Sequence, residues 1–260
     1  MLLEGRVVVV SGIGPGMGRD ISLACARQGA DIVLAARSAD RLDAVAAEVR
    51  ELGRRALPVP TDVTDDEQVL RLVATTIEEF GRVDTLVNNA FKQPPFATLE
   101  GMDMADWNES LEMNCTQAVR FSRAVLPTMR TQGMGSIVNI ATLSIRNNRP
   151  NFGAYAAAKS ALTSVTRTMA QEVGPDGIRV NAVCPGYIMG DSVRWYLESL
   201  AEQAGTTYQD EYDRVAGEIA LRFIPDSEQI AGAVVFFASE LSCAVTGTSL
   251  DVNGGLWMTW

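Results

Sequence analysis

The sequence contains no histidine, so the side chain that most often transfers protons near neutral pH is missing. Its four cysteines are scattered and lack the paired spacing of a zinc site or a disulfide framework: Cys25, Cys115, Cys184 and Cys243. We therefore expect buried thiols, a reducing compartment and no metal site. Any acid–base chemistry has to come from another titratable side chain, such as tyrosine or lysine.

Long apolar runs and excess positive charge are also missing. Runs such as residues 231–238 are too short to span a bilayer, and the N-terminal residues lack the apolar segment of a signal peptide. We expect a cytoplasmic protein without a membrane partner. The 22 lysines and arginines are outnumbered by 32 aspartates and glutamates, which gives a net charge of -10. Such a polyanion repels phosphate backbones, so we expect no nucleic-acid partner.

The sequence does contain a regular alternation of two patterns. Short β-branched runs alternate with longer segments of helical period, such as residues 39–52 and 65–80, which place apolar side chains on one face. This alternation predicts βαβ units and a parallel sheet with helices on both faces. The expected strands are residues 6–11, 31–36, 55–60, 83–88, 135–141 and 178–183.

No linker or charge block divides the chain, so we expect one α/β domain, a doubly wound parallel sheet of about seven strands. An acidic, aromatic insertion at residues 191–224 follows the sixth strand and is expected to form two helices broken at residues 204–207. Trp195 in this insertion either contacts the substrate or simply packs. The C-terminal residues Trp257, Met258 and Trp260 are costly to leave in water.

The first strand runs into a glycine-rich turn that opens a helix. Glycine permits the tight turn and lets backbone N–H groups approach a pyrophosphate at the positive end of the helix dipole. The strand–turn–helix context therefore favours a dinucleotide site over a plain tight turn. The glycines concerned are Gly12, Gly14, Gly16 and Gly18.

The end of the second strand bears on the choice of dinucleotide. An acidic residue there would bind a ribose 2′-OH and repel a 2′-phosphate, but the chain has Ala36, Arg37 and Ser38. The planar guanidinium of Arg37 is suited to a phosphate. This favours NADP(H), with NAD(H) possible; in the alternative interpretation Arg37 is a solvated charge at the start of a helix.

Tyr155 and Lys159 stand four positions apart in an alanine-rich segment, and so share one face of a helix. A neighbouring ammonium favours the phenolate, so we expect Lys159, together with the positive ring of a bound nicotinamide, to lower the pKa of Tyr155 toward the neutral range. A phenol tuned in this way gives a proton to a carbonyl or takes one from an alcohol. By itself the pair is a weak signal, because most such pairs on helices have no chemistry.

Two further motifs end strands: Asn88-Asn89-Ala90 ends the fourth, and Pro185-Gly186 ends the sixth. Together with the glycine turn and the Tyr155/Lys159 pair, they resemble the classical short-chain dehydrogenase/reductase family over nearly the whole chain, in order and at the family's spacing. The resemblance implies a Rossmann-like fold and an NAD(P)(H)-dependent oxidoreductase that interconverts a secondary alcohol and a ketone. It implies that Tyr155 is the acid or base, that Lys159 tunes it and that Asn114 anchors a proton relay. The family's tetramers bury C-terminal tails, so a homotetramer or homodimer is expected. The expected cofactor positions are Gly12, Gly14, Gly16, Met17, Gly18, Arg37, Ser38, Asp62, Val63, Asn89, Ala90, Lys159, Pro185, Gly186 and Ile188.

The sequence departs from the family pattern at three places. Thr142 stands where the family has its catalytic serine, thirteen residues before the tyrosine, and Ser144 is an alternative for the same role or a substrate contact. Phe91 replaces a glycine and could wall the substrate site. Gly190 replaces a threonine that bonds the carboxamide of the cofactor. The tentative substrate contacts are therefore Ser144, Phe91 and Trp195.

Two other functions fit a chain of this type. One is a non-catalytic NAD(P)-binding sensor or scaffold of the same fold. The other is a Rossmann-like methyltransferase, in which the Tyr155/Lys159 helix has no purpose. Steroids, cyclic terpenoids, acyl thioesters and sugars all remain open as substrates.

Overall fold

A computed structural model describes residues 1–258 of the chain. Seven parallel strands form one sheet in the order β3-β2-β1-β4-β5-β6-β7. The strands are β1 (Val7–Ser11), β2 (Asp31–Ala36), β3 (Ala56–Pro60), β4 (Thr85–Asn88), β5 (Gly135–Ile140), β6 (Ile178–Pro185) and β7 (Ser249–Val252).

Helices connect successive strands. The α-helices are α1 (Met17–Arg27), α2 (Ala39–Glu51), α3 (Asp66–Phe80), α4 (Met104–Leu111), α5 (Gln117–Gln132), α6 (Gly153–Val173), α7 (Asp191–Ala204), α8 (Tyr208–Glu218) and α9 (Ser227–Ala238). The π turn η1 (Glu112–Thr116) joins α4 to α5, and three 3₁₀ turns are η2 (Leu143–Ile145), η3 (Gly174–Asp176) and η4 (Glu240–Ser242).

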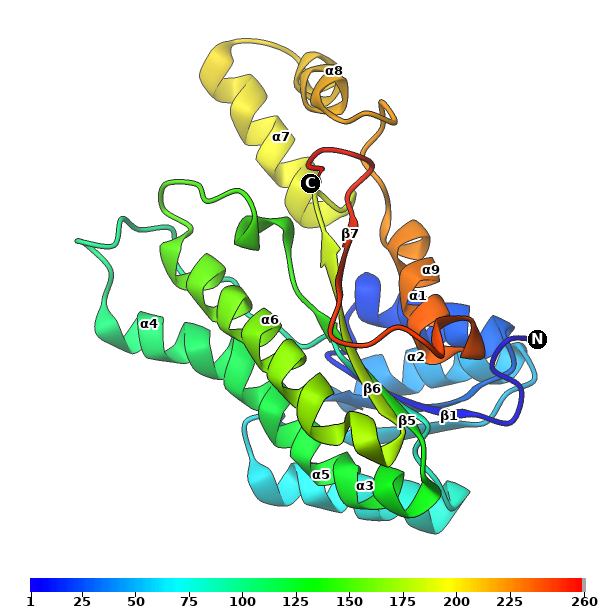
Figure 1. Ribbon diagram of the computed structural model, residues 1–260. Coiled ribbons are helices and arrows are strands. Elements are labelled where there is room, and N and C mark those ends of the chain that lie inside the picture. The colour runs from blue at the N-terminus through cyan, green and yellow to red at the C-terminus, as the bar shows by residue number, and fades with distance from the viewer. Residues whose placement is uncertain (259–260) are drawn as a thin grey trace.

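The sheet is covered on both faces, as the alternation predicted. Helices α1, α2 and α9 cover one face, and α3, α5 and α6 cover the other (Figure 1). Alternate residues of β1 enter the two cores, because successive side chains of a strand point to opposite faces. Val8 and Val10 pack with α1 and α9, whereas Val7 and Val9 pack on the opposite side. The expected fold class is confirmed.

Six strands lie within two residues of their expected positions, and the seventh is β7 at the edge of the sheet. The sequence Ser249–Val252 is short, polar at two of its four positions and only partly buried. It therefore gave no continuous apolar signal. Its pairing with β6 places it, through the register Ala182 with Ser249 to Pro185 with Val252.

The insertion at residues 191–224 forms the two expected helices, α7 and α8. The break follows from local chemistry, because Gly205 ends α7 in the left-handed region at φ +66° and Thr207 begins α8 with a capping box. The pair stands beyond the carboxyl end of β6, apart from the two-faced core (Figure 1). It has a small apolar core of its own, centred on Leu197 and Ile219.

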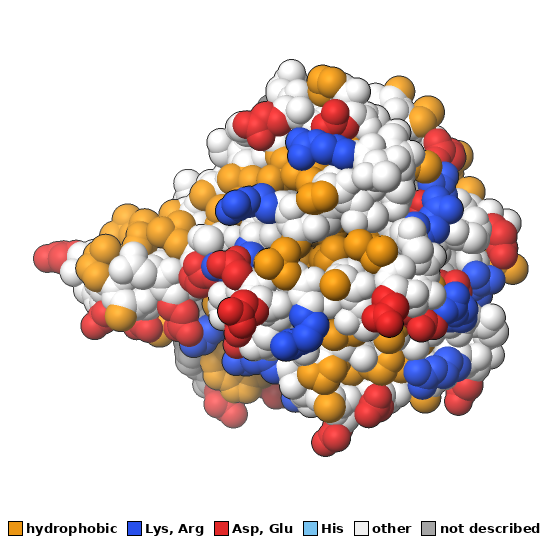
Figure 2. Space-filling model, turned by 90° about the horizontal axis from the view of Figure 1, so that it is seen from below, with side chains coloured by type: hydrophobic (Ala, Val, Ile, Leu, Met, Phe, Trp, Pro, Cys, Tyr) orange, Lys and Arg blue, Asp and Glu red, His pale blue; other side chains and the backbone are white. Residues whose placement is uncertain are grey.

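The surface mixes both signs of charge on the face drawn in Figure 2. Of the helices within residues 1–258, none has both the length and the apolar character that crossing a bilayer requires. Trp257 and Met258 are exposed, and Trp260 lies outside the described residues.

Candidate active site

A large cleft opens at the carboxyl ends of β1 and β4. The chain passes from β1 outward to β2 and β3 and then returns to β4 on the other side of β1, which makes this a topological switch point. The cleft has a volume of about 1020 Å³. Its lining includes Gly12, Gly14, Arg37, Ser38, Arg41, Asp62, Val63, Asn89, Ala90 and Phe91.

The glycine turn is packed tightly against the end of β4. Gly12 has φ +77°, and a Cβ there would lie 2.4 Å from Cα of Ala90. A Cβ on Gly18 would lie 2.4 Å from the carbonyl oxygen of Gly12. Asn89 holds the turn by donating from Nδ2 to that same carbonyl oxygen at 2.8 Å. The turn and β4 are therefore positioned as one unit, and the first and last glycines cannot carry a side chain without movement.

The middle of the turn is open. A Cβ on Gly14 or Gly16 would meet no other atom within 4 Å, so the backbone there is free for a ligand to approach. Helix α1 begins at Met17, directly after this backbone, and presents its N-terminal N–H groups. An open glycine backbone at a helix start, within a cleft of about 1020 Å³, fits a dinucleotide.

The cleft is lined by two cations that follow the end of β2. Arg37 and Arg41 both line it, and neither has an ion pair with any residue in the described part of the chain. Sequence reasoning missed Arg41, although it lies only four residues after Arg37, in the first turn of α2. Asp62 lines the same cleft, and hydrogen bonds from the backbone N–H and hydroxyl of Thr64 lower the pKa of its carboxyl group.

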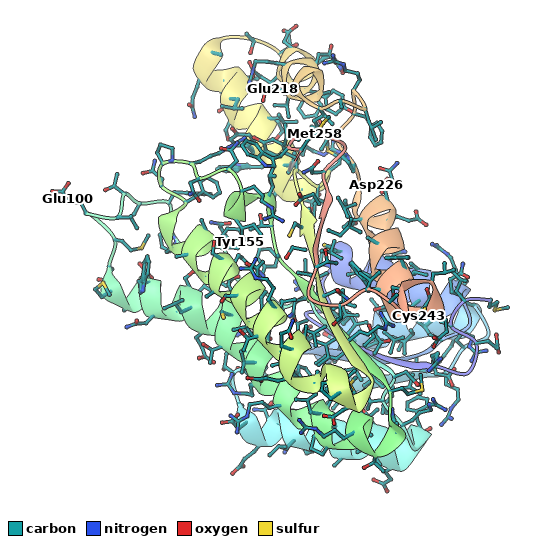
Figure 3. All side chains as sticks on the ribbon, viewed as in Figure 1. Glu100, Tyr155, Glu218, Asp226, Cys243 and Met258 are labelled. Atoms are coloured by element: carbon teal, nitrogen blue, oxygen red, sulfur yellow. The ribbon has the colours of Figure 1, made fainter. Side chains whose placement is uncertain are left out.

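A second, smaller pocket contains the expected catalytic hydroxyls. Its volume is about 170 Å³, and Thr142, Ser144 and Tyr155 all line it. Thr142 lies two residues after the end of β5 and caps η2, and its Oγ1 lies 3.4 Å from Oγ of Ser144. Tyr155 is on α6, near the helix end closest to α7 and α8 (Figure 3). The fold thus brings together groups that are thirteen residues apart in sequence.

The pKa of Tyr155 differs from the expected one. Removal of water by the surrounding protein raises this pKa to about 12, and the Thr142 side chain lowers it only in part. This direction is opposite to the one expected from Lys159, and a lowering by Lys159 together with a bound nicotinamide ring stays a prediction. The ammonium of Lys159 donates instead to the carbonyl oxygen of Ile140, at 2.7 Å, so burial dominates the phenol.

Lys159 is one of the largest fully buried side chains, with 2% of its surface exposed. Burial lowers its pKa to about 8, because a low-dielectric surrounding disfavours the ammonium. Lys159 lines neither cavity. Its contact with Ile140 fixes α6 to the last residue of β5, two residues before Thr142.

Asn114 lies in a segment where the helical hydrogen bonds widen to a π pattern. The π turn η1 carries it, buried, and its side chain binds the loop after β4. Its Nδ2 donates to the carbonyl oxygen of Lys92 at 2.8 Å, and its Oδ1 accepts from the N–H of Lys92 at 3.4 Å. These contacts join η1 to that loop; its part in a proton relay stays a prediction.

The remaining expected residues fall at different places. Met17 and Ile188 pack against the core beside α1 and α9. Pro185 is the last residue of β6, and Gly186 lines the smaller pocket instead of the large cleft. Phe91, 60% exposed, lines the large cleft, and Trp195, 64% exposed, lines neither cavity.

The smaller pocket also has walls that sequence reasoning did not assign. They are Leu143, Asn147, Arg149, Phe152, Tyr187 and Leu256. Asn147 and Arg149 come from the loop between η2 and α6, and a run of asparagine, arginine and proline gives no periodic signal. Tyr187 lies between Gly186 and Ile188, two expected cofactor positions, so the sequence did indicate this segment as part of the site.

Known proteins match the chain over nearly its full length. Residues 12–257 match the family model described as Enoyl-(Acyl carrier protein) reductase. The Short chain dehydrogenase/reductase astE of Aspergillus oryzae is 35% identical over 256 residues, which cover 98% of this chain and 95% of that protein.

Two solved structures show the same architecture. L-Sorbose reductase from Gluconobacter frateurii, complexed with NADPH and L-sorbose, has a TM-score of 0.93, 32% identity and full coverage of both chains at 100%. Carveol dehydrogenase from Mycobacterium avium, in complex with NAD, has a TM-score of 0.91 and 29% identity, and the match covers 98% of each chain. The chain therefore belongs to the short-chain dehydrogenase/reductase family and is an oxidoreductase that uses a nicotinamide cofactor.

Proposed function

We propose that this oxidoreductase interconverts a secondary alcohol and a ketone, with proton transfer by Tyr155. A bound nicotinamide cofactor supplies or accepts the hydride. Tyr155 gives a proton to the carbonyl oxygen during reduction and takes the hydroxyl proton during oxidation. The single observation that carries the proposal is that Tyr155 and Thr142 line one pocket of about 170 Å³, together with Gly186.

Thr142 is the better candidate for polarising the substrate oxygen. Both hydroxyls line the pocket, but only the Thr142 side chain contributes to the pKa of Tyr155, and it does so in the direction that favours the phenolate. Ser144 lies two residues after Thr142, within η2, and its backbone N–H donates to Oγ1 of Thr142 at 3.3 Å. A hydroxyl at Thr142 can donate to the substrate oxygen as negative charge develops on it.

Lys159 and Asn114 have supporting roles in the proposed proton transfer by Tyr155. The buried ammonium of Lys159 supplies positive charge on the same helix, one turn away from the phenol. Asn114 holds the loop after β4 against η1, and we assign it to a proton relay together with Lys159. Both assignments follow the family resemblance.

Tyr155→Phe tests the central assignment. We expect turnover of ketones, followed by absorbance of the reduced nicotinamide, to fall at least about a thousandfold, because general acid–base catalysis contributes on that scale. Cofactor affinity should change less than about threefold. In the same assay, Thr142→Ala should cost more activity than Ser144→Ala. A Tyr155→Phe variant with normal turnover would contradict the proposal.

The cofactor we propose is NADP(H), with NAD(H) as the weaker ligand. Arg37 and Arg41 line the large cleft, Ser38 lies between them, and β2 ends at Ala36 without a carboxylate. Charge-assisted, bidentate hydrogen bonds make guanidinium groups suited to a 2′-phosphate.

Titration of protein fluorescence with NADPH and NADH measures this preference. NADPH should bind at least about tenfold more tightly, and Arg37→Gln should remove most of the difference while leaving NADH affinity unchanged. A variant at an arginine outside the cleft, Arg71→Gln, serves as the control for net charge. Tighter binding of NADH than NADPH by the unchanged protein would overturn the preference.

The insertion at residues 191–224 is proposed to cover the substrate, because it stands beyond the carboxyl end of β6 (Figure 1). We also propose a cytoplasmic homotetramer or homodimer. The exposed Trp257 and Met258 support an assembly, since large apolar side chains are costly to leave in water. Light scattering during gel filtration measures the subunit number.

A further inference from the structure

One wall of the smaller pocket carries a positive charge. Arg149 lines the pocket of about 170 Å³ that Tyr155 and Thr142 also line. Within residues 1–258, no carboxylate lies within ion-pair distance of its guanidinium. Glu218 acts on Arg149 only at longer range, and that carboxylate already lies 3.3 Å from Nη1 of Arg214. The chain as a whole has a net charge of -10. A cation without an ion pair in the wall of this pocket therefore runs against the overall charge of the protein.

Arg149 is held in place by aromatic side chains, although it is on an exposed loop. Its Nη1 donates to Oη of Tyr187 at 2.5 Å, and its guanidinium carbon lies 5.4 Å from the centroid of the Tyr187 ring. Tyr187 in turn stacks on Tyr196 of α7, with ring centroids 6.1 Å apart. The hydrogen bond to Tyr187 also raises the pKa of Arg149, so the group stays cationic at any working pH. A guanidinium fixed by one of its five N–H donors keeps the others for a ligand.

The rest of the pocket is chemically divided. Phe152 and Leu256 give it apolar surface, Thr142 and Tyr155 give it two hydroxyls, and Arg149 gives it charge. Figure 3 shows Tyr155 on α6, beneath the α7–α8 pair. The lining residues place the pocket where the start of α6, the loop before it and the segment after β6 meet, and none of them belongs to the insertion. A substrate that touches all of these walls has a carbonyl or carbinol at one end, an apolar middle and an anionic group at the other.

We propose that Arg149 binds an anionic group of the substrate, so that the enzyme acts on a hydroxy acid or keto acid in preference to its neutral analogue. This inference rests on the proposed function, because it takes Tyr155 as the end of the pocket where the carbonyl reacts. A carboxylate is the group that matches best, since a guanidinium binds its two oxygens in a fork geometry. Arg149 is then a specificity-determining residue that does not take part in proton transfer.

The insertion has three arginines, and none of them lines the smaller pocket. Arg214 forms ion pairs with Glu211 and Glu218. Arg194 lies with its guanidinium carbon 5.9 Å from the ring centroid of Tyr208, and Arg222 donates to the backbone carbonyl of Gly217. Arg194 is therefore a matched control, an arginine over a tyrosine ring that does not face Tyr155.

Calorimetric titration with pairs of ligands tests the inference without turnover. The probes are benzoate and benzamide, cyclohexanecarboxylate and its amide, and 4-oxopentanoate and its amide. We expect at least one carboxylate to bind about tenfold or more tightly than its amide, with a preference that weakens at high salt. Arg149→Gln should remove this preference and leave amide affinity unchanged, while Arg194→Gln should keep it.

Three results would overturn the inference. They are equal affinity for acid and amide in every pair, no saturable binding of any carboxylate, or a preference that survives Arg149→Gln. Circular dichroism checks that the variant is folded, and its loop position makes misfolding a small risk.

Turnover separates this inference from the proposed function. Tyr155→Phe should bind carboxylates as the unchanged protein does and lose activity. If ketones are reduced with no preference for acids, the assignment of Arg149 fails alone. If carboxylates bind through Arg149 and Tyr155→Phe keeps full activity, the proposed role of Tyr155 fails alone.

Discussion

At the residue scale, the proposed active site contains two ionisable groups whose burial moves their pKa values in opposite directions. Burial raises the pKa of Tyr155 to about 12 and lowers that of Lys159 to about 8. Near neutral pH the tyrosine is therefore a protonated phenol, and a cationic lysine stands one helical turn further along α6. Ketone reduction requires a group that donates a proton, and the protonated phenol of Tyr155 can do so. Alcohol oxidation requires the phenolate, which accepts the proton.

The pH dependence of kcat/KM for ketone reduction tests this pair, because that ratio reports the groups of the free enzyme. Lys159 is cationic below a pKa of about 8 and neutral above it, so the stabilisation of developing phenolate is lost as pH rises. We expect kcat/KM for reduction to fall above about pH 8. Lys159→Met should be poorly active and lack this fall. A profile that stays flat from about pH 7 to pH 10 would contradict the assignment.

At the element scale, different glycines of the turn between β1 and α1 serve helix packing and ligand binding. Gly18 lies where a side chain would meet the carbonyl oxygen of Gly12 at 2.4 Å. Gly14 lies where a side chain would meet nothing within 4 Å, and it lines the large cleft. The two glycines therefore serve different purposes within this single turn: Gly18 lets α1 approach β1, and Gly14 leaves room for a ligand.

Gly18→Ala and Gly14→Ala form a matched pair that measures the two roles. Gly18→Ala should lower the free energy of unfolding by about 1–3 kcal/mol, the usual cost of overpacking. Gly14→Ala should leave that free energy within about 0.5 kcal/mol and weaken cofactor binding. Urea unfolding and cofactor titration give both quantities. Equal destabilisation by the two variants would show that steric fit does not distinguish them.

At the scale of the whole molecule, the packing of helices on both faces of the sheet determines which thiols are buried and which can react. Cys25, Cys115 and Cys184 are buried, and Cys243, after η4, is exposed. Burial raises the pKa of the Cys25 and Cys184 thiols to about 12, which leaves almost no reactive thiolate.

Titration with a chromogenic disulfide reagent measures this difference between the thiols. The native protein should show one rapidly reacting thiol, and the unfolded protein should show all four. Cys243→Ser should abolish the rapid phase and leave the slow phase unchanged. Rapid reaction of a second thiol in the native protein would mean that a covered face of the sheet opens readily.

Much of the architecture could be predicted because its signals are local. The strand–helix alternation, the glycine turn and the break at Gly205 each depend on a few adjacent residues, and each lies where it was expected. The spacing of Tyr155 and Lys159 is likewise fixed by one helical turn. The edge strand β7 was not located, because its polar sequence acquires meaning only from pairing with β6.

The sequence alone determined the parallel sheet, the dinucleotide turn and the family, since periodicity and short motifs carry this information along the chain. The tertiary structure decided the direction of the pKa shift of Tyr155, the π turn that carries Asn114 and the presence of Arg149 in the pocket. Each of these depends on burial or on contacts between distant segments. Desolvation and long-range packing arise only after the chain has folded, so no local pattern could have given them.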